Sequence, residues 1–98
     1  MLKINEEYSN FLFEAILALK TKEECKNFFL DLCTYQELES LAQRLQVAKL
    51  LRDGKSYVDI NGETGASTAT ICRVSRSLNY GEGGYKTVLE KILGENNE

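Results

Sequence analysis

A chain of 98 residues, 43% of them hydrophobic and 28% charged, has the composition of one small globular domain and leaves no room for a separate catalytic module. Its formal net charge of −3 does not by itself indicate a polyanionic partner. The longest apolar stretch, residues 11–19, is interrupted by Glu14 and is too short to span a bilayer, and nothing resembles a signal peptide. We therefore expect a cytoplasmic protein with no membrane partner.

The residue types that most often perform catalysis or bind metals are missing or scattered. The sequence has no histidine, no phosphate-binding loop and no nucleophile elbow, so we expect no enzymatic activity. The cysteines Cys25, Cys33 and Cys72 are odd in number and far apart. This pattern predicts three reduced thiols rather than a disulfide framework or a metal site.

The first expected element is a helix over residues 8–20, because apolar residues recur there at helical spacing. Phe11, Phe13 and Leu17 add apolar faces beside the main stripe. A helix that is apolar on several sides must be covered on several sides, and one short chain has few elements for that. This segment therefore predicts an intertwined dimer.

Further helices follow in chain order. Thr21 and Thr34 each precede a glutamate by three residues, which is the pattern of a capping box at a helix start. The helix that begins after Thr34 is expected to end at Asp53-Gly54, where glycine tolerates a left-handed backbone. Shorter helices are expected over residues 57–64, from a cap at Ser67 to about residue 79, and over residues 84–93.

The fold expected from these elements is all-α, with about six helices in one domain over residues 1–98. Residues 8–53 would supply dimerisation helices, residues 56–78 a helix-turn-helix, and residues 84–93 a last dimerisation helix. In the helix-turn-helix, Ile60, Ile71 and Val74 are spaced to form the small core between two helices, and Gly65 stands where the turn needs a positive φ. The alternative is an ordinary helical hairpin whose polar residues are only solvated.

The charge distribution favours a nucleic-acid partner for this half of the chain. Residues 41–80 carry a net charge of +3 and the remainder carries −6. The second helix of the motif also presents short hydroxyl side chains, which suit base edges, and arginines, which suit phosphate or guanine.

Leu41-Ala-Gln-Arg44 and Thr64-Gly-Ala-Ser-Thr-Ala-Thr-Ile-Cys-Arg73 resemble the Trp repressor family, in particular its YerC/YecD-type branch, and the resemblance covers about residues 11–92. It implies six helices per protomer in an intertwined, Trp repressor-like homodimer, with a recognition helix over residues 68–78. It also places the family's base-reading positions at Thr68, Ala69, Thr70 and Cys72. The full set of candidate DNA-binding residues is Lys55, Ser67, Thr68, Ala69, Thr70, Cys72, Arg73 and Arg76.

The same resemblance implies a candidate small-ligand site at Arg44, Arg73 and Ser77. Two arginines hold tryptophan in the Trp repressor, and they correspond to Arg44 and Arg73, while Thr34 and Ser77 match positions near that ligand. Val74 stands where tryptophan-binding members have glycine, and its branched side chain fills space that the indole ring needs. We therefore expect no tryptophan corepressor and no other cofactor. Arg44 and Arg73 are expected to make structural or phosphate contacts, with a small-ligand role as the alternative.

The function expected from the sequence is sequence-specific regulation of transcription, most simply repression, by a homodimer on double-stranded DNA. The alternative is a helical protein–protein adaptor whose helix-turn-helix has lost its contact with DNA.

Overall fold

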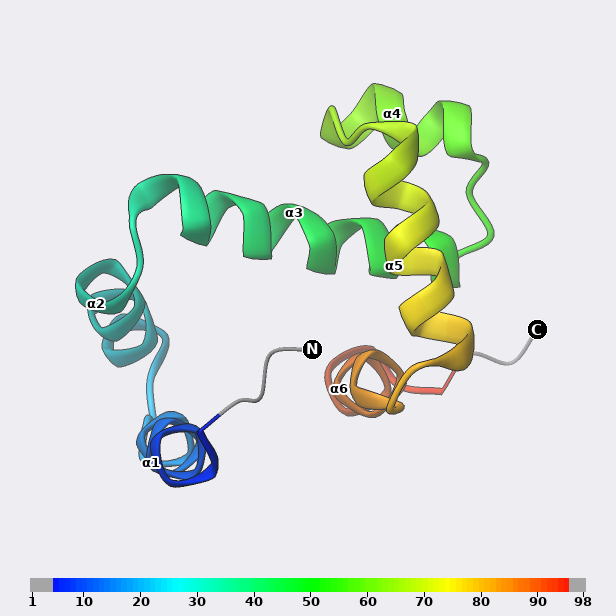
Figure 1. Ribbon diagram of the computed structural model, residues 1–98. Coiled ribbons are helices and arrows are strands. Elements are labelled where there is room, and N and C mark those ends of the chain that lie inside the picture. The colour runs from blue at the N-terminus through cyan, green and yellow to red at the C-terminus, as the bar shows by residue number, and fades with distance from the viewer. Residues whose placement is uncertain (1–4, 96–98) are drawn as a thin grey trace. The chain divides into compact units, whose positions relative to one another are not determined.

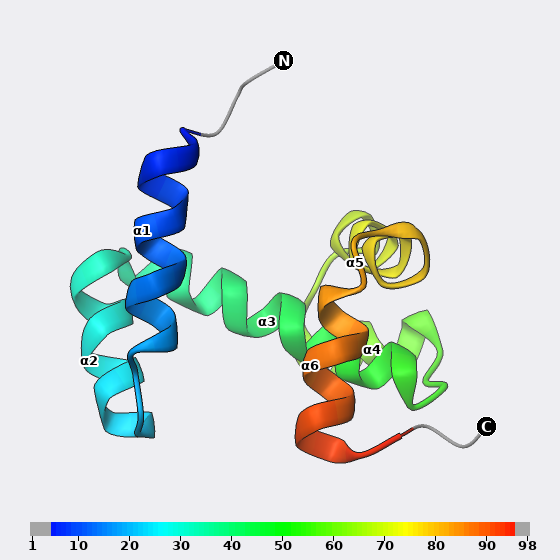
Figure 2. The same ribbon diagram turned by 90° about the horizontal axis from the view of Figure 1, so that it is seen from below.

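The computed structural model describes residues 5–95, and every regular element among them is an α-helix (Figures 1 and 2). The all-α fold expected from the sequence is therefore confirmed for this part of the chain. The helices are α1 (Glu6–Leu17), α2 (Lys22–Leu32), α3 (Tyr35–Arg52), α4 (Tyr57–Thr64), α5 (Thr68–Tyr80) and α6 (Gly84–Leu93). They form two compact units, one up to Leu38 and one from Glu39 onward, so the boundary lies within α3.

In the first unit, α1 begins and ends earlier than the expected range of residues 8–20. It begins early because the Asn5 side chain caps it, accepting a hydrogen bond of 3.0 Å from the backbone nitrogen of Tyr8. It ends at Leu17 because the next helix already engages the backbone beyond it. The backbone nitrogen of Lys20 donates to the carboxylate of Glu24 at 2.8 Å, and Thr21 caps α2 by accepting from the Glu24 nitrogen at 3.0 Å.

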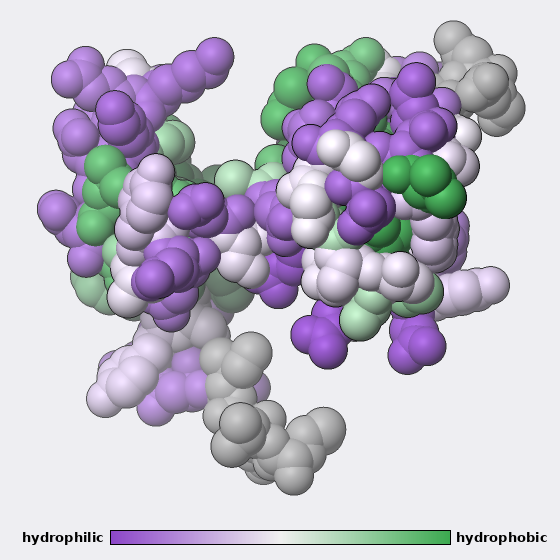
Figure 3. Space-filling model, turned by 90° about the horizontal axis from the view of Figure 1, so that it is seen from above, coloured by the Kyte–Doolittle hydropathy of each residue, from purple (hydrophilic) through white to green (hydrophobic). Residues whose placement is uncertain are grey.

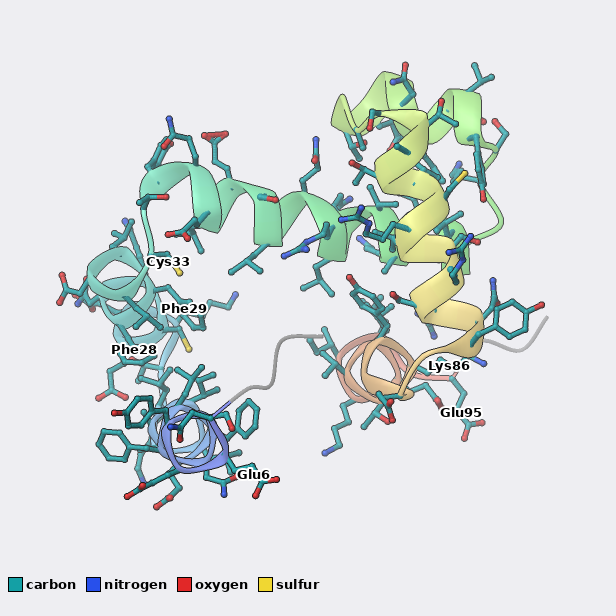
Figure 4. The ribbon with its side chains drawn as sticks, in the orientation of Figure 1. Glu6, Phe28, Phe29, Cys33, Lys86 and Glu95 are labelled. Carbon is teal, nitrogen blue, oxygen red and sulfur yellow. The ribbon has the colours of Figure 1, made fainter. Side chains whose placement is uncertain are left out.

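The first unit buries little of its apolar surface. No residue of α1 or α2 is buried, and on α1 the side chains of Phe11 and Leu17 are 73% and 84% exposed. On α2, the rings of Phe28 and Phe29 meet edge to face with centroids 5.5 Å apart, next to Cys33 at the end of the helix (Figure 4). Cys25, Cys33 and Cys72 are free thiols, as the sequence predicts.

Helix α3 starts with the capping box that the sequence predicts. The hydroxyl of Thr34 accepts a hydrogen bond of 3.1 Å from the Glu37 nitrogen, and the Glu37 carboxylate accepts one of 2.8 Å from the Thr34 nitrogen. The two bonds satisfy backbone donors that have no partner within the helix.

The second unit contains the hydrophobic core. In Figures 1 and 2, α5 crosses both α3 and α6 at steep angles, so the three helices converge on a shared centre. The larger side chains fully buried there come from α3, α4 and α5, which is why the short helix α4 holds its position despite its length. The buried residues are Val47, Ala48, Leu50, Ile60, Ala66, Ile71, Val74 and Leu89, with Leu51 and Tyr85 packed against them.

None of the helices within residues 5–95 has both the length and the apolar character needed to cross a bilayer. On the face seen from above, hydrophilic, near-neutral and hydrophobic residues are mixed (Figure 3).

Candidate nucleic-acid interface

Helices α4 and α5 and the three residues between them form the expected helix-turn-helix. The Ser56 hydroxyl caps α4 by accepting from the Asp59 nitrogen at 3.1 Å, and Gly65 ends the helix with φ of 73°. Helix α5 then begins directly after its cap, Ser67. Both caps and the left-handed glycine are confirmed. Such signals can be predicted from sequence because each acts on residues within one helical turn.

The small core of this motif is also confirmed. Ile60 of α4 and Ile71 of α5 have no exposed surface, and Val74 is 1% exposed. Ala66, in the turn itself, is equally buried, so a larger side chain there would force the two helices apart.

The face of α5 opposite this core carries most of the candidate reading residues. At 100° per residue, positions 69, 72, 73 and 76 lie on the side of the helix away from Ile71 and Val74, and all four are exposed. Thr68 is exposed in the first turn, where side chains project beyond the helix end. The structure thus brings together on one surface Thr68, Ala69, Cys72, Arg73 and Arg76.

Ser67 and Thr70 lie at the edge of that surface and are partly committed to the helix start. Ser67 accepts a hydrogen bond from the Thr70 nitrogen at 3.2 Å, and its hydroxyl also donates to the Thr70 hydroxyl at 3.2 Å. Thr70 is only half-exposed. A base contact by either hydroxyl would have to be made in addition to, or in place of, this pair of bonds.

The cationic candidates are on accessible positions. Lys55 lies in the loop between α3 and α4 and is exposed, as are Arg73 and Arg76 on α5. Within residues 5–95, none of these three side chains is held by an ion pair or a side-chain hydrogen bond, so their charges face solvent. A solvated cation on a long side chain is suited to a phosphate contact, which needs little geometric precision.

The candidate small-ligand residues have different environments. Arg44 of α3 is half-buried, whereas Arg73 and Ser77 of α5 are exposed. Val74 lies inside the hydrophobic core, so its side chain occupies volume next to α3. A surface pocket exists in this unit at the ends of α3, α5 and α6, near Lys86 and Glu95 (Figure 4), and none of the three candidates lines it. Its lining residues are Leu51, Arg52, Leu78, Asn79, Lys86, Leu89, Glu90 and Glu95.

Three side chains to which the sequence assigned no role hold the turn in place. Asn61 and Thr64, on α4, bond to backbone groups of the turn, and Gln43 reaches it from α3. The contact of Gln43 with Thr64 joins residues 21 positions apart, far outside the reach of the spacing rules that identify helices and caps. A sequence signal was present for the α4 residues, because polar side chains next to a glycine turn often bond to its backbone.

Comparisons with known proteins agree with this architecture. Residues 7–93 match the family described as Trp repressor protein. A relative from Bacillus subtilis (strain 168), described as "Uncharacterized protein YerC", is 58% identical over 81 residues, which is 83% of this chain and 78% of the relative.

Solved structures give the same result. A candidate Trp repressor from Staphylococcus aureus superposes with a TM-score of 0.89 at 49% identity, covering 95% of this chain and 93% of that one. A TrpR-like protein from Eubacterium eligens ATCC 27750 superposes with a TM-score of 0.87 at 52% identity, covering 90% and 91%. On sequence and on structure, this chain belongs to the Trp repressor family.

Proposed function

We propose that the protein is a sequence-specific, DNA-binding regulator of transcription that represses its targets as a homodimer in the cytoplasm. The observation that carries this proposal is the exposed face of α5. It combines short side chains at the helix start with Arg73 and Arg76 further along, directly opposite a fully buried packing face. A helix with one exposed polar face and one buried apolar face can enter a major groove while its apolar face stays packed in the core.

The electrostatics of this half of the chain support the same partner. Residues 41–80 carry a net charge of +3 within a chain of net charge −3, so cations are concentrated around the helix-turn-helix. The carboxylates of Asp59 and Glu63 on α4 repel phosphate. They therefore favour an orientation in which DNA approaches from the side of the motif that carries the arginines. In this proposal Arg73, Arg76 and Lys55 contact phosphates, while Thr68, Ala69 and Cys72 face the bases.

The apolar surface of α1 supports the homodimer. Tyr8, Phe11, Phe13 and Leu17 are all more than half exposed in the single chain, and a soluble protein rarely leaves so many large apolar side chains on one short helix in contact with water. Leu41 and Leu45 of α3, together with Val88 and Ile92 of α6, expose further apolar surface. A second copy of the chain has the same surfaces and can cover them reciprocally.

Val74 supports regulation without tryptophan. Because it is fully buried in the core, its side chain takes up the volume that a glycine at this position would leave empty. Arg44 and Arg73 then act as a structural and a phosphate-contacting residue, respectively.

The proposal is tested by selection of sheared genomic DNA fragments with the purified protein, followed by titration of an enriched fragment and a random fragment at about 50 and 200 mM salt. We expect a reproducible enriched motif with two half-sites, and an affinity that falls steeply with salt for both fragments. The matched control is a pair of charge reversals, Arg76→Glu on α5 and Lys91→Glu on α6, of which only the first should abolish binding. Absence of enrichment, with equal behaviour of the two variants, would exclude DNA reading and favour a protein–protein adaptor.

A further inference from the structure

The turn of the helix-turn-helix is held from outside the motif by a side chain of α3. The amide nitrogen Nε2 of Gln43 donates a hydrogen bond of 3.1 Å to the backbone carbonyl of Thr64, in a partly buried position. Thr64 is the last residue of α4, so no backbone N–H group of that helix donates to its carbonyl oxygen. The bond satisfies this carbonyl and at the same time connects α3 to the point where the chain changes direction.

Three further backbone groups of the turn are satisfied from within the motif. The Gly65 nitrogen donates to the Asn61 carbonyl at 2.8 Å, and the Ala66 nitrogen donates to the Thr64 hydroxyl at 3.1 Å. The Ala66 carbonyl accepts from Asn61 Nδ2 at 2.8 Å. These bonds give the turn a single shape, but they do not fix its direction relative to α3, whereas the Gln43 bond does.

We infer that Gln43 is a positioning residue for DNA reading, acting through the Thr64 carbonyl on the start of α5. This inference rests on the proposed function. The first reading residues, Thr68 and Ala69, follow Thr64 closely in the chain, so a small rotation of the turn displaces them directly. Base contacts tolerate errors of only about 0.5 Å or 10–20°, whereas arginines on long side chains still reach phosphates after such a rotation.

The hydrophobic core does not supply this constraint by itself. Ile60, Ile71 and Val74 share one core with Val47 of α3 and hold the helices together, but burial of apolar area has no preferred direction of its own. A hydrogen bond is directional and weakens steeply when its angle departs from linearity. Gln43 therefore adds a restraint on orientation where packing supplies mainly cohesion.

The test compares Gln43→Met with Gln46→Met. Both glutamines are on α3 and line the same surface pocket beside Thr64, but of the two, within residues 5–95, only Gln43 has a side-chain hydrogen bond. Methionine keeps the length and helix propensity of glutamine and removes the donor. Three quantities are measured for each variant: affinity for the selected fragment, affinity for a random fragment, and hydrogen exchange of the Gly65 amide. That amide belongs to the same peptide group as the Thr64 carbonyl, so its exchange reports on how firmly the Gln43 bond holds this peptide group in place.

For Gln43→Met we expect affinity for the selected fragment to fall about fivefold, the change that corresponds to one net hydrogen bond. Affinity for random DNA should stay unchanged and Gly65 exchange should accelerate, while Gln46→Met should match the unaltered protein in all three measurements. If Gln43→Met does not fold, Gln43→Ala replaces it, because alanine also removes the donor, adds no charge and favours the helix.

Two results overturn the inference. One is a selected-to-random affinity ratio for Gln43→Met equal to that of Gln46→Met. The other is equal weakening on both fragments together with a lower melting temperature, which would indicate a purely structural bond. Failure of the proposed function is distinguishable from both, because in that case the unaltered protein already selects no sequence.

Discussion

The hydroxyl oxygen of Ser67 lies 3.2 Å from both the backbone nitrogen and the hydroxyl oxygen of Thr70, so one side chain caps α5 and restrains a neighbour at the edge of the candidate interface. Ser67→Ala should lower the free energy of unfolding by about 1 kcal/mol, the usual value of a helix cap. Ser67→Asp keeps a capping oxygen and should preserve stability, yet its negative charge should weaken binding to every DNA sequence. Urea unfolding and DNA titration separate the two effects, and an unchanged midpoint for Ser67→Ala would contradict the capping role.

The two glycines of the α4 region should respond oppositely to alanine. Gly65 has φ of 73° and no atom within 4 Å of an added Cβ, so Gly65→Ala should cost about 1–2 kcal/mol from backbone conformation alone. Gly62 lies inside α4, with equally open space, and Gly62→Ala should stabilise the protein by up to about 1 kcal/mol. Thermal unfolding of the two variants checks both signs, and a shift in the same direction would show that backbone conformation does not decide them.

The starts of α4 and α5 and the helix ends at Gly54 and Gly65 were predictable, because a cap acts through residues three positions apart and a glycine acts at its own position. The earlier start of α1 has a local signal too, since Asn5 stands three residues before Tyr8. Its earlier end is different. It depends on the Glu24 carboxylate reaching back to the Lys20 nitrogen, one residue beyond the cap where a capping box normally closes.

The sequence predicts which face of α5 is exposed, but not which side chains near that face are already engaged in hydrogen bonds. The spacing of Ile71 and Val74 identifies the buried side of α5 and thus the exposed side with Arg76. The engagement of Thr70 with Ser67, and that of Gln43 with Thr64, depend on rotamers and on the path of α3, about which one-dimensional spacing carries no information.

Arg76 should contribute to DNA affinity without contributing to specificity. Arg76→Ala should weaken selected and random fragments by the same factor and reduce the slope of log affinity against log salt by about one. Lys91→Ala, at an exposed position on α6, is the matched control and should leave the slope unchanged. A change confined to particular base pairs would place Arg76 at a base edge instead.

Leu17 should lie in a protein interface. Its side chain is 84% exposed in the single chain. Leu17→Glu should nevertheless raise the dimer dissociation constant at least tenfold, because dimerisation would then bury an unpaired carboxylate. Val58→Glu, at an 81% exposed position on α4, should leave the sedimentation behaviour at micromolar concentration unchanged. A stable folded monomer of the unaltered protein would contradict the homodimer.

Tryptophan should have no effect on this protein. A ligand shifts an equilibrium only by its difference in affinity for the two states, and Val74 adds volume that a well-packed site resists at a cost of about 1–3 kcal/mol. Melting temperature and DNA affinity should therefore be the same with and without millimolar tryptophan. Stabilisation by several degrees, or tenfold tighter binding to the selected fragment, would show that Arg44 and Arg73 still form a ligand clamp.

The uneven distribution of buried residues has a consequence for biosynthesis. Helices α1 and α2 are synthesised before α3 to α6, yet no residue of either is buried, and the core is built from residues 47–89. Most domains fold as units in order of synthesis, but here the early segment has no buried core of its own. In the proposed homodimer its apolar side chains are covered only when a second copy binds, so the nascent chain, more than the assembled protein, is the form that calls for protection by a chaperone.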